Sequence, residues 1–146
     1  MISNKILKVL GIMLGFLSFS MVPSFFWSLY YNESAQLISF TYSFLITFFF
    51  ALILYLSSYL FKETKHDISS LDAFTIVTFG WILTAFFGSL PYFLSPNNLS
   101  FIDSFFESMS GFTTTGATIL GLHTTSIESL GYGLLFWRSF TQFLGG

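Results

Sequence analysis

Four consecutive residues, Thr113, Thr114, Thr115 and Gly116, have the types and spacing that suit cation binding best in this 146-residue chain. Backbone carbonyl oxygens, with threonine hydroxyls beside them, can replace the water shell of a dehydrated alkali cation. Gly116 permits backbone angles that let its carbonyl turn toward a common axis. Thr and Gly are also frequent in ordinary turns, so the surrounding elements must decide between an ion-binding loop and an inert one.

A short amphipathic helix is expected directly before these residues. If Ser100 caps it and it runs to Ser110, it is about 16 Å long, roughly half of a 30 Å hydrocarbon core. We expect Gly111 to break this helix, after which about five extended residues would return the chain toward the outer surface. The sequence therefore predicts a re-entrant pore helix over about residues 100–110 and a selectivity-filter loop over 113–118.

Three charged residues belong to the same unit. Asp103 and Glu107 are four positions apart, so they share one face of the short helix. Arg138 is a basic residue inside an apolar segment, and an intramembrane charge is by default a functional hypothesis. We interpret the three as pore-helix support or electrostatic residues: an ion pair of Arg138 with Glu107 would brace the helix, and the carboxylates would attract cations. The alternative for Arg138 is a side chain that snorkels to the outer headgroups.

The overall composition is that of a membrane protein. Hydrophobic residues make up 53% of the chain and charged residues only 8%. Three uncharged intervals each exceed the roughly 20 residues that cross a hydrocarbon core: 9–32, 34–61 and 73–102. Lys5 and Lys8 before an apolar run would also fit a secretory signal peptide, but this run is too long and lacks a small-residue cleavage site.

The predicted fold is an all-α polytopic membrane protein in two parts. Residues 1–68 form an N-terminal pair of transmembrane helices, over about 6–30 and 36–61. Residues 69–146 form a pore unit with an outer helix over about 71–94, the short pore helix, the filter and an inner helix from about 132. Ser69 and Asp72 have the spacing of a cap at the start of the outer helix. We expect two small residues in that helix, Gly80 and Gly88, to contact helices outside this chain.

The lysines predict the orientation of the chain in the membrane. Lys5 and Lys8 flank the first helix, and Lys62 and Lys65 follow the second, whereas Glu33 is the charged residue of the loop between them. Because Lys and Arg favour the cytoplasmic side, we expect a cytoplasmic N-terminus and an outer Glu33 loop.

Several function classes are disfavoured. Without cysteine the chain has no disulfide framework and no thiolate metal site. A net charge of -2 and a pI near 5.5 argue against nucleic acid as a partner. His66 and His123 are far apart, and we expect both in solvated loops rather than in a metal or catalytic site. No nucleophile or phosphate-binding loop accompanies the carboxylates, so we predict neither an enzyme nor a cofactor.

Two segments, DSFFESMSGFTTTGAT at 103–118 and FWRSFTQFLGG at 136–146, resemble the first pore loop and following helix of the Trk/Ktr/HKT superfamily of potassium transporters. The extra N-terminal helix pair is closest to the bacterial TrkH-type membrane subunit. One departure is Phe143, where the family usually has Trp. The resemblance implies four helix, pore-loop, helix units in one polypeptide, with Gly116 as the first of four filter glycines.

Further expectations come from this resemblance. The chain would take part in potassium uptake across the bacterial cytoplasmic membrane, with potassium as transported ligand and membrane lipid around it. Its partners would be three more pore units of the same polypeptide, a second copy in a homodimer, and a cytoplasmic nucleotide-binding regulatory subunit of TrkA type.

The helix beginning near residue 132 has only 15 residues up to Gly146, about 22 Å, which is too short to span the core. We therefore expect the chain to be a fragment, with a truncated product that assembles with other copies as the alternative. Two other functions stay open: a non-transporting membrane anchor or assembly subunit, and one subunit of a multi-chain cation channel.

Overall fold

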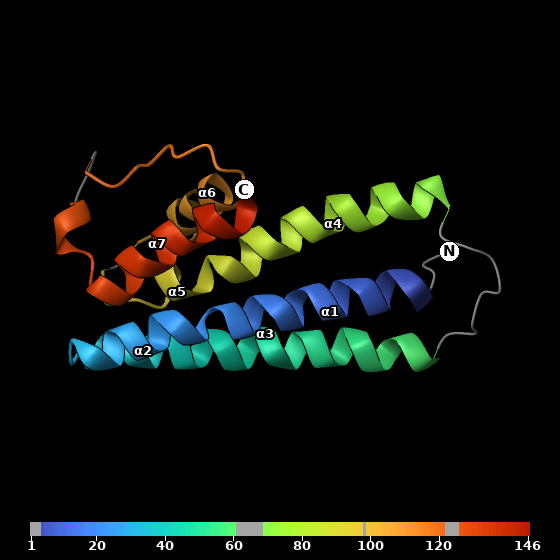
Figure 1. Cartoon of the computed structure of the whole chain (residues 1–146), viewed down its shortest axis with the longest axis horizontal. Helices are drawn as coiled ribbons and strands as arrows, with labels where there is room; N and C mark the ends of the chain where they lie inside the picture. Colours follow the sequence, from blue (N-terminus) through green and yellow to red (C-terminus); the bar gives the residue numbers. More distant parts are fainter. Residues whose placement is uncertain (1–3, 61–68, 98, 122–125) are drawn as a thin grey trace.

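The computed structural model describes residues 4–60, 69–97, 99–121 and 126–146, and every regular element in these ranges is helical (Figure 1). In chain order the elements are α1 Asn4–Ser20, α2 Val22–Tyr30, α3 Ser34–Leu60, α4 Ser70–Gly88, α5 Leu90–Phe93, α6 Phe101–Phe112, the 3-10 turn η1 Ile127–Ser129 and α7 Tyr132–Gly145.

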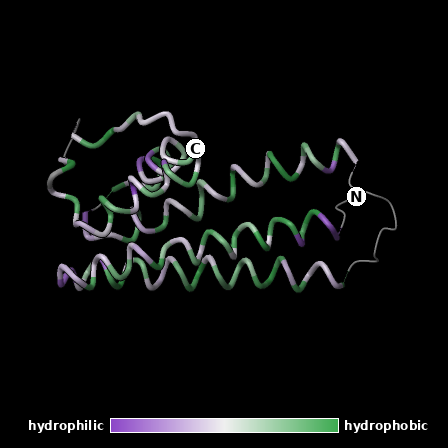
Figure 2. The backbone as a smooth tube through the Cα atoms, viewed as in Figure 1, coloured by the Kyte–Doolittle hydropathy of each residue, from purple (hydrophilic) through white to green (hydrophobic). Residues whose placement is uncertain are grey.

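Three helical stretches are long and apolar enough to cross a membrane: Asn4–Tyr30, Ser34–Leu60 and Ser70–Phe93. Hydrophobic residues run along most of their length (Figure 2). The first two lie side by side as an antiparallel pair, and the third crosses beside them (Figure 1). The chain is therefore an all-α, multi-pass membrane protein.

The first span is not the single continuous helix that the sequence predicts. α1 ends at Ser20 and α2 starts at Val22, with Pro23 in the first turn of α2. A proline has no N–H to donate to the preceding turn and its ring crowds that turn, which explains the break.

The third span is interrupted in the same way, by Pro91. α4 ends at Gly88, where the sequence predicts a helix to residue 94, and α5 adds one further turn. The Tyr92 N–H, which would bond to the Gly88 carbonyl in a regular α-helix, bonds instead to the Ser89 carbonyl at 3.1 Å. The Gly88 carbonyl oxygen is thereby left available to another helix.

The predicted helix starts are present, but the predicted end of the short helix is wrong. Ser69 and Asp72 form a reciprocal capping box on α4, and Ser100 accepts a hydrogen bond from the Asp103 N–H. Gly111 does not end α6, which continues to Phe112. The position needs glycine because a Cβ there would collide with the Thr141 hydroxyl of α7. Gly111 therefore marks a close contact between α6 and α7.

The small residues of α4 have neighbours within this chain, contrary to expectation. A Cβ at Gly88 would press on Ser108 and Phe112 of α6, and a Cβ at Gly80 would lie 2.9 Å from the end of Met13 in α1. Close helix approach thus serves the internal packing of the fold.

α7 is anchored by a fully buried tryptophan. The Trp137 ring packs edge-on against Phe40 of α3 and Phe112 of α6, with centroids 6.4 and 6.2 Å apart. Its indole N–H donates to the Gly88 carbonyl oxygen at 3.0 Å. The start of α7 lies at the same end of the molecule as the α2–α3 turn and α5 (Figure 1).

Candidate functional site

α6 turns its polar face toward the protein interior. Its buried residues are Ser104, Glu107, Ser108, Ser110, Gly111 and Phe112, whereas Phe101, Ile102 and Phe106 are exposed, Ile102 to 78%. A helix on a water-soluble protein shows the reverse pattern. α6 therefore has a surface suited to apolar surroundings and an interior face that can carry hydrogen bonds and charge.

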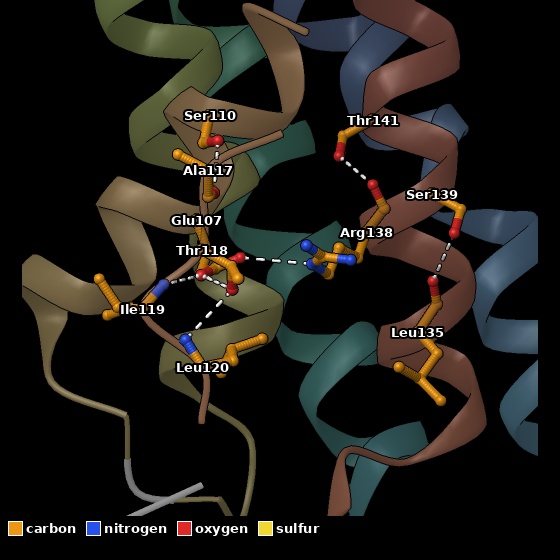
Figure 3. A network of polar contacts seen from close by, with 10 residues as sticks. All are labelled: Glu107, Ser110, Ala117, Thr118, Ile119, Leu120, Leu135, Arg138, Ser139 and Thr141. Atoms are coloured by element: carbon orange, nitrogen blue, oxygen red, sulfur yellow. Dashed lines mark hydrogen bonds and ion pairs between the residues drawn. The ribbon is translucent and has the colours of Figure 1, made fainter. Parts of the chain in front are cut away.

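After α6 the chain folds back along the helix it has just left. Thr114 and Gly116 have positive φ angles, 56° and 71°, which reverse the chain direction. The N–H groups of Thr115 and Gly116 both donate to the Ser110 carbonyl, at 3.0 and 3.4 Å. The Ser110 hydroxyl then donates to the Ala117 carbonyl at 2.6 Å (Figure 3). These bonds tie the returning segment to the last turn of α6.

Three carbonyl oxygens of this segment are unpaired. Within the described part of the chain, the carbonyls of Thr114, Thr115 and Gly116 accept no hydrogen bond. The neighbouring carbonyls are used: that of Thr113 accepts from the Thr114 hydroxyl, and that of Ala117 from Ser110. Residues 113–117 are exposed. The segment thus combines exposed residues with unpaired carbonyl oxygens, and such oxygens are of the kind that bind alkali cations.

Glu107 of α6 connects its own helix to the returning segment and to α7 (Figure 3). One carboxylate oxygen accepts from the Thr118 hydroxyl at 2.5 Å and from the Ile119 N–H at 2.8 Å. The other lies 3.5 Å from Nε of Arg138 on α7. Glu107 is 2% exposed, so its charge is enclosed by protein and does not face the solvent.

The other two charged site residues lie in different environments. The Arg138 side chain is 23% exposed and its guanidinium is directed at α6, as Figure 3 shows. Asp103 is half-buried in the first turn of α6 and forms no ion pair with the described residues. The structure thus brings Arg138 to Glu107 and leaves Asp103 apart. His66, His123, Lys62 and Lys65 lie outside the described residues.

Glu33 is a contact residue that the sequence alone did not reveal. Its carboxylate accepts from the Tyr132 N–H at 2.6 Å and from the Gly133 N–H at 3.0 Å, so it caps the start of α7. These partners are about a hundred positions away along the chain, and no local pattern connects them.

Comparison with known protein families identifies the family to which this chain belongs. Residues 41–146 match the TrkH family, described as cation transport protein. The chain belongs to the TrkH family. All of α6, the returning segment and α7 lie within the matched residues.

Individual TrkH relatives align over almost the whole chain. It is 32% identical over 144 residues to the Trk system potassium uptake protein TrkH of Vibrio parahaemolyticus, covering 98% of this chain and 28% of the relative. It is 35% identical over 149 residues to the Trk system potassium uptake protein TrkG of Escherichia coli. This match covers 95% of this chain and 28% of the relative. An uncharacterized cation transporter of Methanocaldococcus jannaschii is 35% identical over 147 residues, which cover 99% of this chain and 27% of the relative. The chain spans little more than a quarter of these relatives.

Proposed function

We propose that this chain contributes one of four filter loops to a Trk-type potassium transporter, with Thr113, Thr114, Thr115 and Gly116 as the potassium-binding residues. The observation that carries the proposal is the returning segment with its unpaired, exposed carbonyl oxygens. Oxygens of this kind replace the hydration shell of potassium in a selectivity filter. The names of the relatives, potassium uptake proteins and cation transporters, support the same substrate.

α6 is the proposed re-entrant pore helix. Its 12 residues correspond to about 18 Å, which is too short to cross a hydrocarbon core of about 30 Å. Non-helical backbone is tolerated at membrane depth only where protein surrounds it or where it lines a wet cavity. In the proposed transporter the exposed side of the segment after Phe112 would line the wet pore, while Ser110 and Glu107 hold its other side. The negative C-terminal end of the α6 dipole, next to the filter, also favours a cation there.

Glu107 and Arg138 have a supporting role in this proposal. A buried carboxylate that binds the Thr118 hydroxyl and the Ile119 N–H fixes the filter segment against α6. The Arg138 guanidinium compensates its charge, which would otherwise be costly to bury. Asp103, near the start of α6, stabilises the positive end of the helix and attracts cations to the pore mouth.

The complete transporter would contain three further pore units in the same polypeptide and would form a homodimer in the bacterial cytoplasmic membrane. The N-terminus would lie in the cytoplasm, and a nucleotide-binding subunit of TrkA type would regulate the pore. The resemblance to Trk-type transporters is the ground for proposing the further pore units, the dimer, the membrane and the regulatory subunit, and the positions of the lysines are the ground for proposing the orientation.

The test is Gly116→Ala in the full-length protein, reconstituted in liposomes, with uptake of potassium and sodium measured. A Cβ at Gly116 meets no close neighbour, with Gln142 at 3.8 Å, so the effect comes from the φ of 71°. We expect a reduced preference for potassium over sodium. Gly15→Ala, whose Cβ has nothing within 4 Å, is the control. An unchanged preference in Gly116→Ala refutes the filter assignment, and absence of cation uptake by the wild type favours the anchor or assembly subunit.

A further inference from the structure

The carboxylate of Glu33 joins the N-terminal helix pair to the pore unit. Both of its oxygens accept backbone hydrogen bonds at the start of α7, from Tyr132 and Gly133. A carboxylate suits this place because the N-terminus of a helix has unpaired N–H groups and a partial positive charge.

The backbone of Glu33 is itself held by hydrogen bonds at the end of α2. Its N–H donates to the Ser28 carbonyl at 2.9 Å, and the Asn32 N–H donates to the Leu29 carbonyl at 3.2 Å. With Asn32 at a φ of 57°, this is the Schellman arrangement that ends many helices. The Glu33 carbonyl then accepts the first hydrogen bond of α3, from Leu37. The backbone of Glu33 is thus fixed by two helices.

The contact surface between α2 and α7 extends beyond the cap. Tyr31 stacks on Tyr132 with centroids 4.1 Å apart, and Trp27 stacks on Phe136 at 5.3 Å. A Cβ on Gly133 would collide with the Ser28 hydroxyl, so the two helices are in close contact there. The Glu33 cap and these contacts together hold α7 against α2.

α7 connects the cap at Glu33 to the residues that hold the filter segment. Arg138 is six residues after Tyr132, about 9 Å along the helix, and its guanidinium faces Glu107. Glu107 in turn holds Thr118 and Ile119 at the end of the filter segment. We propose that Glu33 is a positioning residue for the filter: its cap keeps Arg138 in register with Glu107. This proposal rests on the proposed transport function.

Two measurements on the full-length protein test it. Hydrogen exchange of the backbone amides should rise about tenfold at 132–136 in Glu33→Ala, because charge-assisted bonds are lost, and should also rise at 115–120. In liposomes the same variant should show a lower preference for potassium over sodium at equal protein content. Glu33→Gln keeps a carbonyl oxygen as acceptor, so it should restore part of the protection from exchange and part of the preference for potassium.

Asp72→Ala is the matched control, since Asp72 also caps a helix but, among the described residues, forms hydrogen bonds only with Ser69 of its own capping box. It should leave exchange at 115–120 and the ion preference as in the wild type. Faster exchange in Glu33→Ala confined to 132–136, with an unchanged ion preference, overturns the positioning role. If wild-type liposomes take up no cation, the transport proposal fails, while exchange at 115–120 still decides whether Glu33 positions that segment.

A second variant displaces the carboxylate without removing its charge. Gly131 precedes α7, and a Cβ there would lie 2.8 Å from a Glu33 carboxylate oxygen and 2.7 Å from the Gln36 amide nitrogen. Its φ of −63° accepts alanine without strain. Gly131→Ala should therefore reproduce the exchange and ion-preference changes of Glu33→Ala, and wild-type behaviour at 115–120 would contradict the proposal.

Discussion

The indole N–H of Trp137 donates to the carbonyl oxygen of Gly88, at the point where α4 gives way to α5. The break in the third span, which Pro91 causes, thus supplies a hydrogen-bond acceptor that a regular helix would use internally. α4 and α7 are linked at this point, and Phe112 at the end of α6 packs on the same indole ring.

Trp137→Phe should lower the free energy of unfolding by about 1–3 kcal/mol, because the buried Gly88 carbonyl loses its partner while an aromatic ring remains. Thermal unfolding of the full-length protein in detergent measures this. Trp81→Phe, at a position 42% exposed, should change stability much less. Equal effects of the two substitutions would show that the hydrogen bond contributes nothing beyond ring packing.

Glu107→Gln should reduce both stability and potassium preference. The substitution keeps an acceptor for Ile119 but leaves Arg138 without its counter-charge, and we expect a loss of about 2 kcal/mol because Arg138 retains some solvent contact. Unfolding in detergent and ion uptake in liposomes are the measurements. Asp103→Asn removes the same charge from the same helix and should cost less, about 0.3–1 kcal/mol, because Asp103 interacts with the helix dipole and not with Arg138. Unchanged selectivity and protein level in Glu107→Gln would disprove the bracing role.

Gly111→Ala should destabilise the contact between α6 and α7 by about 1–3 kcal/mol, since the added methyl group collides with the Thr141 hydroxyl. The double variant Gly111→Ala with Thr141→Ala should regain part of the loss, because the colliding atom is gone. Unfolding free energies of the two single variants and the double variant form a double-mutant cycle. Strict additivity would place the cause of the destabilisation elsewhere.

Thr114→Gly should cost less stability than Thr115→Gly, by roughly 1–2 kcal/mol. Both residues are exposed and each hydroxyl makes one contact with Thr113. Only Thr114 of the two has a left-handed φ, 56°, which is unfavourable for a β-branched residue and natural for glycine. Unfolding of the two variants in detergent gives the comparison, and an equal loss would show that Thr114 is not strained.

The helices were predictable from the sequence because their signals are local. Uncharged intervals of spanning length, and a serine three residues before an aspartate, mark α4 and its cap at Ser69. The short helix after Ser100 follows from the same rule. The prediction of a helix end was wrong where a residue type has two structural roles. Gly111 allows close packing against Thr141 instead of ending α6.

The contacts around the candidate site were only partly predictable. The proximity of Arg138 and Glu107 could be argued from depth, because both are charges in apolar segments. The Thr118 and Ile119 contacts of Glu107 depend on the path of the returning chain. The contact between Glu33 and the start of α7 could not be predicted, because an acidic residue in a polar turn is common and nothing near it in the sequence points to Tyr132.

The buried charge on α6 has a consequence for how the protein is made. Glu107 is synthesised 31 residues before Arg138, so α6 leaves the ribosome before the residue that neutralises it. A 12-residue helix with an unpaired carboxylate gains little from entering lipid alone. If α6 is the re-entrant pore helix proposed above, we expect its integration into the membrane to wait for α7, so that the two enter as one hairpin whose charges cancel. In that case the ion pair would set the order of assembly as well as the final geometry.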